Sequence, residues 1–100
     1  MVEKNKIRNT WGAIPTSTGT QYSIYDLAAA SAGNENRIEN NLISDINFNG
    51  ILYGIYITSN YKKVYHNTVS FNQTTSTGTT TYGIYVSGAT GVDVQNNNVS

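Results

Sequence analysis

The sequence predicts an all-β chain built from stacked coils, and two observations lead to this fold class. Its composition is rich in Asn, Thr, Ser and Gly and includes eight Tyr, which favours strands and turns over helices. A short pattern of aliphatic residues and Asn also recurs along the chain. Because one copy is too short to bury its own apolar face, the recurrence predicts that copies stack on one another as a solenoid.

The first repeated block occurs three times without gaps, at residues 37–44, 63–70 and 93–100. Each copy reads aliphatic, two variable residues, Asn, one variable residue, aliphatic, Ser. A degenerate copy at residues 6–12 keeps the first aliphatic residue, Ile7, but has no Asn at the fourth position. The leading aliphatic residues predict coils that start near residues 7, 38, 64 and 94. We expect residues 1–100 to form one segment that is part of a longer solenoid.

A second block, rich in tyrosine, follows each copy at residues 22–25, 53–57 and 82–86. In a strand such as Ile55-Tyr56-Ile57, alternation turns the aliphatic side chains inward and the tyrosine outward. Residues 45–49 alternate in the same way, which predicts a further strand and gives three short strands per coil. The same alternation places Asp26 inward, where the other coils have aliphatic residues, so we expect a distorted first coil there.

The block at residues 64–70, which reads V-x-x-N-x-V-S, and the preceding Y-G-I-Y-I at residues 53–57 together resemble the right-handed parallel β-helix repeat of the pectin-lyase-like superfamily. The resemblance covers about residues 6–100 and implies that fold. It implies less about activity, because the superfamily includes polysaccharide lyases, glycoside hydrolases, phage tailspikes and surface adhesins. A leucine-rich repeat is the weaker alternative, since no copy has the L-x-x-L-x-L strand pattern.

Two columns of equivalent residues are the candidate sites. Asn41, Asn67 and Asn97 share one repeat position, so their carboxamides are predicted to form a structural Asn ladder at a turn. The outward column of Tyr25, Tyr56 and Tyr85 is the candidate carbohydrate contact, because sugar rings stack on aromatic faces. The alternative for the tyrosines is that they only stack on each other across neighbouring strands.

Metal binding and catalysis receive little support. Asp45, Asn47 and Asn49 match the first half of a calcium-binding EF-hand loop, but Tyr56 stands where the loop needs a bidentate acid. These three residues are therefore only weak metal candidates. The six acidic residues do not cluster in the sequence, and we assign no catalytic residue and no cofactor. The acids are Glu3, Asp26, Glu35, Glu39, Asp45 and Asp93.

Charge and hydropathy limit the expected partners. The formal net charge is zero, so no basic field attracts nucleic acid, and no apolar run has the length of a membrane-spanning helix. We expect a non-catalytic segment of a secreted or cell-surface bacterial protein, with polysaccharide as partner and edge-to-edge self-association of the terminal coils. The alternatives are part of a polysaccharide lyase or glycoside hydrolase with catalytic acids outside these residues, and a spacer stalk.

Overall fold

The structure is a computed structural model that describes residues 1–8, 19–46, 48–71 and 80–100. All secondary-structure elements within these ranges are β-strands, which confirms the all-β prediction. The strands are β1 (Val2–Glu3), β2 (Lys6–Arg8), β3 (Thr20–Asp26), β4 (Asn36–Glu39), β5 (Leu42–Ser44), β6 (Ile51–Ile57), β7 (Lys62–Tyr65), β8 (Thr68–Ser70), β9 (Thr81–Val86), β10 (Val92–Gln95) and β11 (Asn98–Val99).

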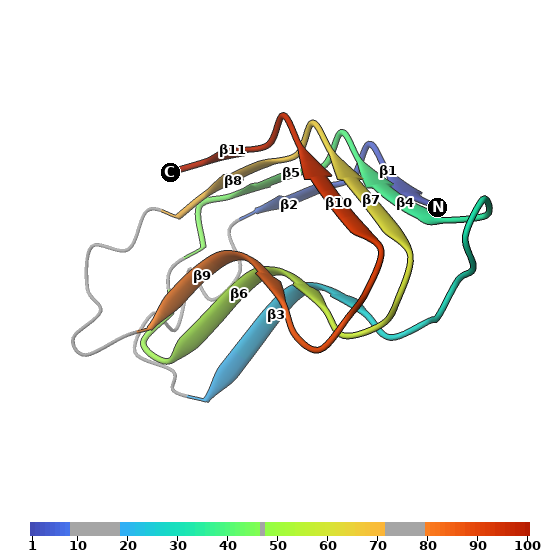
Figure 1. The fold of residues 1–100 in the computed structure, drawn as a ribbon. Helices are drawn as coiled ribbons and strands as arrows, with labels where there is room; N and C mark the ends of the chain where they lie inside the picture. Colours follow the sequence, from blue (N-terminus) through green and yellow to red (C-terminus); the bar gives the residue numbers. More distant parts are fainter. Residues whose placement is uncertain (9–18, 47, 72–79) are drawn as a thin grey trace.

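The strands form three parallel sheets. Each of the first three coils adds one strand to each sheet, and the fourth coil adds β10 and β11 to the first two sheets (Figure 1). The first sheet has the order β1-β4-β7-β10, the second β2-β5-β8-β11, and the third β3-β6-β9. Every pairing between these strands is parallel. The backbone N–H and C=O groups of each coil therefore find hydrogen-bond partners in the neighbouring coils. This pairing holds the stack together without disulfides, since the chain has no cysteine.

The register corrects the predicted position of the first coil. Val2, and not Ile7, pairs with Ile38 in the first sheet, whereas Ile7 pairs with Ile43 in the second. The first copy of the repeat is therefore residues 2–8, which read V-x-x-N-x-I and keep the Asn at Asn5. The alignment at residue 7 failed because it matched the second aliphatic position of this copy to the first position of the others.

The three strands of each coil are also not the three that the sequence predicted. The block at residues 37–44 divides at Asn40 and Asn41 into two strands, β4 and β5, and no strand is found at the described part of residues 45–49. Ile46 and Phe48 nevertheless point into the core, with exposed fractions of 0% and 1%. The alternation predicted the buried side chains correctly, but not the strand.

The aliphatic side chains of the three sheets meet inside the stack. The buried core comes mainly from the second and third coils, whose strands in the first two sheets have a neighbouring strand on either side. Its members are Ile24, Ile38, Ile43, Ile46, Phe48, Leu52, Ile55, Ile57, Val64 and Val69. The fourth coil covers one end of this core, and there the side chains are more exposed, as Val94 shows at 44%.

Candidate functional site

Six tyrosines lie together on the outer face of the third sheet. They form two columns that run across β3, β6 and β9, and we call them the tyrosine surface. One column holds Tyr22, Tyr53 and Tyr82, and the other holds Tyr25, Tyr56 and Tyr85. The second column is the one predicted from the sequence. The first was not predicted, because strict strand alternation turns Tyr53 inward when Tyr56 points outward.

A bend at the glycine of the Y-G-I-Y motif explains how both columns face outward. In β6, Leu52, Gly54, Ile55 and Ile57 are all buried, so two consecutive residues point inward and the alternation is interrupted. A Cβ atom on Gly54 would lie 2.5 Å from the carbonyl oxygen of Gly83 and 2.7 Å from Cγ1 of Val69. Only glycine fits this inward position without displacing its neighbours. The glycine between the two tyrosines of β6 and of β9 is the sequence signal for the first column.

Within each column the rings are nearly parallel. In the first column the centroids are 5.0 and 4.9 Å apart with interplanar angles of 5° and 9°, and in the second 5.0 and 5.2 Å apart with 19° and 7°. Parallel rings in van der Waals contact have planes about 3.5–4.0 Å apart, so neighbouring rings are displaced sideways by about 3 Å. Part of each ring face therefore remains uncovered by the next ring in the column.

The two columns contact each other edge to face. In each coil the two ring centroids are 4.7 to 4.9 Å apart, at interplanar angles between 68° and 85°. Tyr22 and Tyr25 are the most exposed rings, at 41% and 45%, and the other four are half-buried. Burial raises the pKa of Tyr53 and of Tyr56, and the neighbouring phenols raise it further. Tyr53 and Tyr56 thus remain neutral phenols, which can stack and also exchange hydrogen bonds.

The Asn ladder occupies a column where β1, β4, β7 and β10 turn into the second sheet. Asn41 Oδ1 accepts hydrogen bonds from the backbone and side-chain nitrogens of Asn5, at 3.1 and 3.0 Å. Asn67 Oδ1 accepts the same pair from Asn41 at 3.1 and 2.9 Å, and Asn97 Oδ1 from Asn67 at 2.9 and 2.9 Å. The ladder has a fourth member, Asn5, which the misaligned first copy had hidden.

The residue before each ladder Asn adopts a left-handed backbone conformation. Its φ lies between 54° and 58° at Lys4, Asn40, His66 and Asn96. This conformation lets the chain turn sharply between two sheets, and it explains why Asn, which tolerates it best among non-glycine residues, recurs there. The ladder side chains also bind the turns themselves. The side-chain nitrogens of Asn41, Asn67 and Asn97 each donate to a backbone carbonyl of the preceding coil. The geometry gives the ladder a structural role.

Asp26 points inward as the alternation predicts, but the first coil is not distorted there. Asp26 keeps its register opposite Ile57, and its Oδ1 lies 3.0 Å from Nζ of Lys62, whose side chain is fully buried. Lys62 also donates to the carbonyl oxygen of Ala28. A buried charge needs a partner of opposite charge, and this ion pair across two coils provides it. The polar pair was missed because Asp26 and Lys62 lie just outside the repeat blocks, so the repeat pattern does not relate them.

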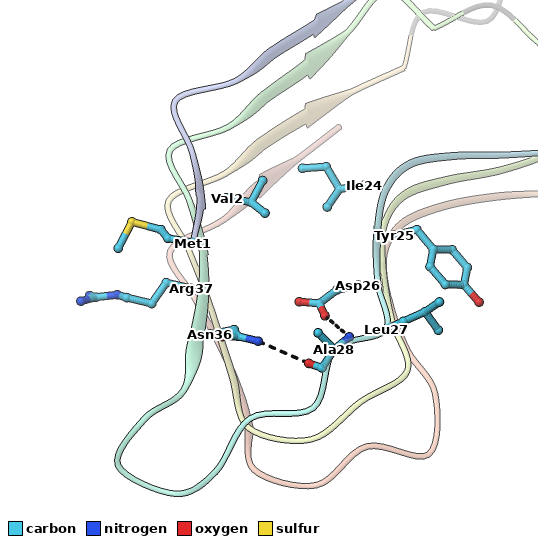
Figure 2. Close-up of a pocket in the computed structure, with 9 residues that line it drawn as sticks. All are labelled: Met1, Val2, Ile24, Tyr25, Asp26, Leu27, Ala28, Asn36 and Arg37. Atoms are coloured by element: carbon cyan, nitrogen blue, oxygen red, sulfur yellow. Dashed lines mark hydrogen bonds between the residues drawn. The ribbon is translucent and has the colours of Figure 1, made fainter.

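A cavity of about 400 Å³ opens at the first coil, between β1 and β3 (Figure 2). Val2, Ile24 and Asp26 point into it, whereas Tyr25 and Arg37 point away. Its floor is the end of the apolar core, and its one inward carboxylate already pairs with Lys62. The cavity therefore has the character of an uncovered core end and lacks converging polar groups of a catalytic site.

The three weak metal candidates, Asp45, Asn47 and Asn49, are not all described by the structure. Asp45 is exposed, Asn49 is half-buried, and Asn47 lies outside the described residues. In the part of the chain that the structure describes, no group of three or more His, Cys, Asp or Glu side chains is placed to hold a metal ion. Nor is any helix in those ranges long and apolar enough to cross a membrane.

On the outer face of the first sheet, Tyr65 donates a hydrogen bond to Asp93, and Gln95 donates to the same carboxylate. These bonds lower the pKa of Asp93, with the bond from Tyr65 the largest cause, and the same bond raises the pKa of Tyr65. Tyr65 is outside the tyrosine surface and has a different environment from its six members.

Comparisons with known proteins identify no relative of this chain. No protein-family model matches the chain, and no curated protein and no solved structure is significantly similar to it. The tyrosine surface is therefore the feature from which a function has to be argued.

Proposed function

We propose that this chain is a non-catalytic segment of a right-handed parallel β-helix of the pectin-lyase-like kind, carried by a secreted or cell-surface bacterial protein. We further propose that its tyrosine surface contacts polysaccharide. The observation that carries the proposal is the ordered array of six outward tyrosines, with parts of the ring faces uncovered and the phenols beside them. Aromatic faces take the apolar face of a sugar ring, while phenols bind its hydroxyl groups.

The chemistry of the surface favours a neutral polysaccharide. The three strands that carry the rings, β3, β6 and β9, contain no Lys or Arg, and their one charged residue, Asp26 at the end of β3, is paired with Lys62. These strands therefore supply no cationic side chain to attract an acidic polysaccharide. The repeat of the rings along the coils also suits a linear partner, because a chain can contact several coils at once.

Affinity electrophoresis tests the proposal. The chain is run in native gels with and without hydroxyethyl cellulose, a neutral polysaccharide, and in parallel with polygalacturonate, an acidic one. We expect the neutral polymer to retard the chain, and the double variant Tyr56→Ala/Tyr85→Ala to lose most of the retardation. Tyr65→Ala is the matched control, because it removes a tyrosine outside the surface. Equal retardation of the double variant and the parent would reject the tyrosine surface as the contact.

A spacer stalk is the second candidate function. It is supported by the same rings, because each contacts its neighbours and thereby contributes to the stack with no ligand bound. A chain that no polysaccharide retards, and whose stability falls when the tyrosines are replaced, would favour the stalk. Release of soluble sugars from either polymer would instead favour the third reading, a part of a polysaccharide-cleaving enzyme.

A further inference from the structure

The tyrosine surface holds six oxidisable phenols in mutual contact. We propose that it is a site of oxidative cross-linking, at which a one-electron oxidant of the peroxidase class joins tyrosines of adjacent coils through a carbon–carbon bond. The proposal does not depend on polysaccharide binding. It depends on the ring contacts alone, because coupling needs two tyrosines close together at the moment when both are oxidised.

The chemistry balances with hydrogen peroxide as the terminal oxidant. Each of two phenols gives up one electron and one proton and becomes a phenoxyl radical, with unpaired spin on the ring carbons beside the hydroxyl carbon. Two such carbons form a bond, and the hydrogen on each then moves to oxygen, which restores both phenols. The product has lost two hydrogen atoms, and these reduce one hydrogen peroxide to two waters.

The geometry supplies the partner for every radical. Tyr53 has four rings within 5.3 Å between centroids, which are Tyr22, Tyr56, Tyr82 and Tyr85. Tyr56 also has four, which are Tyr22, Tyr25, Tyr53 and Tyr85. Reactive groups held this close react as if at very high local concentration, so coupling inside one molecule outpaces coupling between molecules in dilute solution. Exposure of Tyr22 and Tyr25 gives the oxidant access to the surface.

A cross-link between coils would do for this chain what a disulfide does for others. Tyr53 and Tyr82 belong to different coils, and the chain contains no cysteine. A covalent bond between them closes a loop of the unfolded chain and so lowers its conformational entropy. The cross-linked monomer should unfold at a higher temperature than the untreated chain.

The test treats the whole chain, in dilute solution, with horseradish peroxidase and hydrogen peroxide. The monomer is isolated by size exclusion, and its mass and peptide map are measured. We expect a mass lower by two hydrogen atoms for each bond, the fluorescence of dityrosine, and linked peptides that join Tyr53 to Tyr22 or to Tyr82. Tyr61 and Tyr65 lie outside the surface and serve as internal controls, since they should remain unlinked in the monomer.

Two matched double variants separate the effect of ring proximity from the general reactivity of tyrosine toward the oxidant. Tyr53→Phe/Tyr56→Phe keeps the ring stack but leaves the oxidisable tyrosines of the first and third coils two strand spacings, about 10 Å, apart. Links between coils in the monomer should fall roughly tenfold, as expected when coupling depends on held proximity. Tyr61→Phe/Tyr65→Phe should not reduce them.

Three results would overturn the proposal. The first is an unchanged yield of links between coils in Tyr53→Phe/Tyr56→Phe, and the second is coupling of Tyr61 or Tyr65 in the monomer as often as of Tyr53. The third is dityrosine that forms only between molecules. Circular dichroism of each variant verifies that it folds, and a urea-unfolded sample shows the linkage pattern of the chain without its stack.

Discussion

Replacement of Asn67 by leucine is the perturbation that tests the Asn ladder most sharply. The Asn67 side chain is 1% exposed and makes four hydrogen bonds. Its Oδ1 accepts from the backbone and side-chain nitrogens of Asn41, and its Nδ2 donates to the carbonyl of Ile38 and to Oδ1 of Asn97. Leucine has a similar size but can make none of these bonds.

The cost follows from the groups left without a partner. The buried backbone N–H of Asn41 loses its acceptor, which costs about 1–3 kcal/mol, and the carbonyl of Ile38 loses a donor, which costs about 1 kcal/mol more. The side-chain nitrogen of Asn41 keeps its bond to the Val2 carbonyl, and Asn97 is half-exposed, so water replaces its lost donor. We therefore expect a loss of about 2–4 kcal/mol in the free energy of unfolding.

Thermal unfolding followed by circular dichroism measures this loss. For a domain of this size, 2–4 kcal/mol corresponds to a fall in Tm of roughly 10–30 °C. Asn60→Leu is the matched control, because Asn60 is exposed and its side chain accepts a hydrogen bond from the N–H of Thr90. If Asn67→Leu lowers Tm no more than Asn60→Leu does, the buried ladder does not stabilise the stack and the reasoning fails.

Three further predictions follow from other contacts. Gly54→Ala should lower the free energy of unfolding by about 1–3 kcal/mol, because its methyl group overpacks the bend, and a neutral result in urea titrations would contradict the bend. Lys62→Met should lower the free energy of unfolding by about 3–5 kcal/mol, because it leaves Asp26 unpaired. The double variant Lys62→Met/Asp26→Leu should recover most of this loss, and failure to recover it would argue against the ion pair. The pKa of Asp93 lies below its ordinary value of 3.8, so the ionised carboxylate stabilises the folded chain. This contribution is complete above pH 3.8 and is lost as the pH falls through the pKa of the folded state. Tyr65→Phe should raise the pKa of Asp93 in an NMR titration, and an unchanged value would exclude the hydrogen bond as its cause.

The repeat pattern was enough to predict the all-β class, the inward aliphatic residues and the ladder positions Asn41, Asn67 and Asn97. These features are periodic, and the physics that creates them acts on every coil in the same way. The start of the first coil was also within reach, because residues 2–8 match the repeat better than residues 6–12 do. The error lay in the alignment and not in a missing signal.

The features that could not be predicted depend on contacts between unlike parts of the repeat. The first tyrosine column, which holds Tyr53, needs a bend in the strand, and Gly54 reveals this bend only when Gly83 and Val69 are seen beside it. Asp26 directly follows the tyrosine block at residues 22–25, and Lys62 directly precedes the Asn block at residues 63–70, so their ion pair joins two positions outside the repeat blocks. Neither alternation nor spacing contains this information, because both describe one strand at a time.

An aromatic ¹H–¹³C NMR titration of the chain with a neutral β-glucan oligosaccharide tests the central claim most directly. The proposed contact predicts saturable shifts in the ring signals of the tyrosine surface, largest for the exposed rings of Tyr22 and Tyr25, while Tyr61 and Tyr65 stay unchanged. Shifts of equal size in all eight tyrosines, or no shift in any of the six, would contradict it.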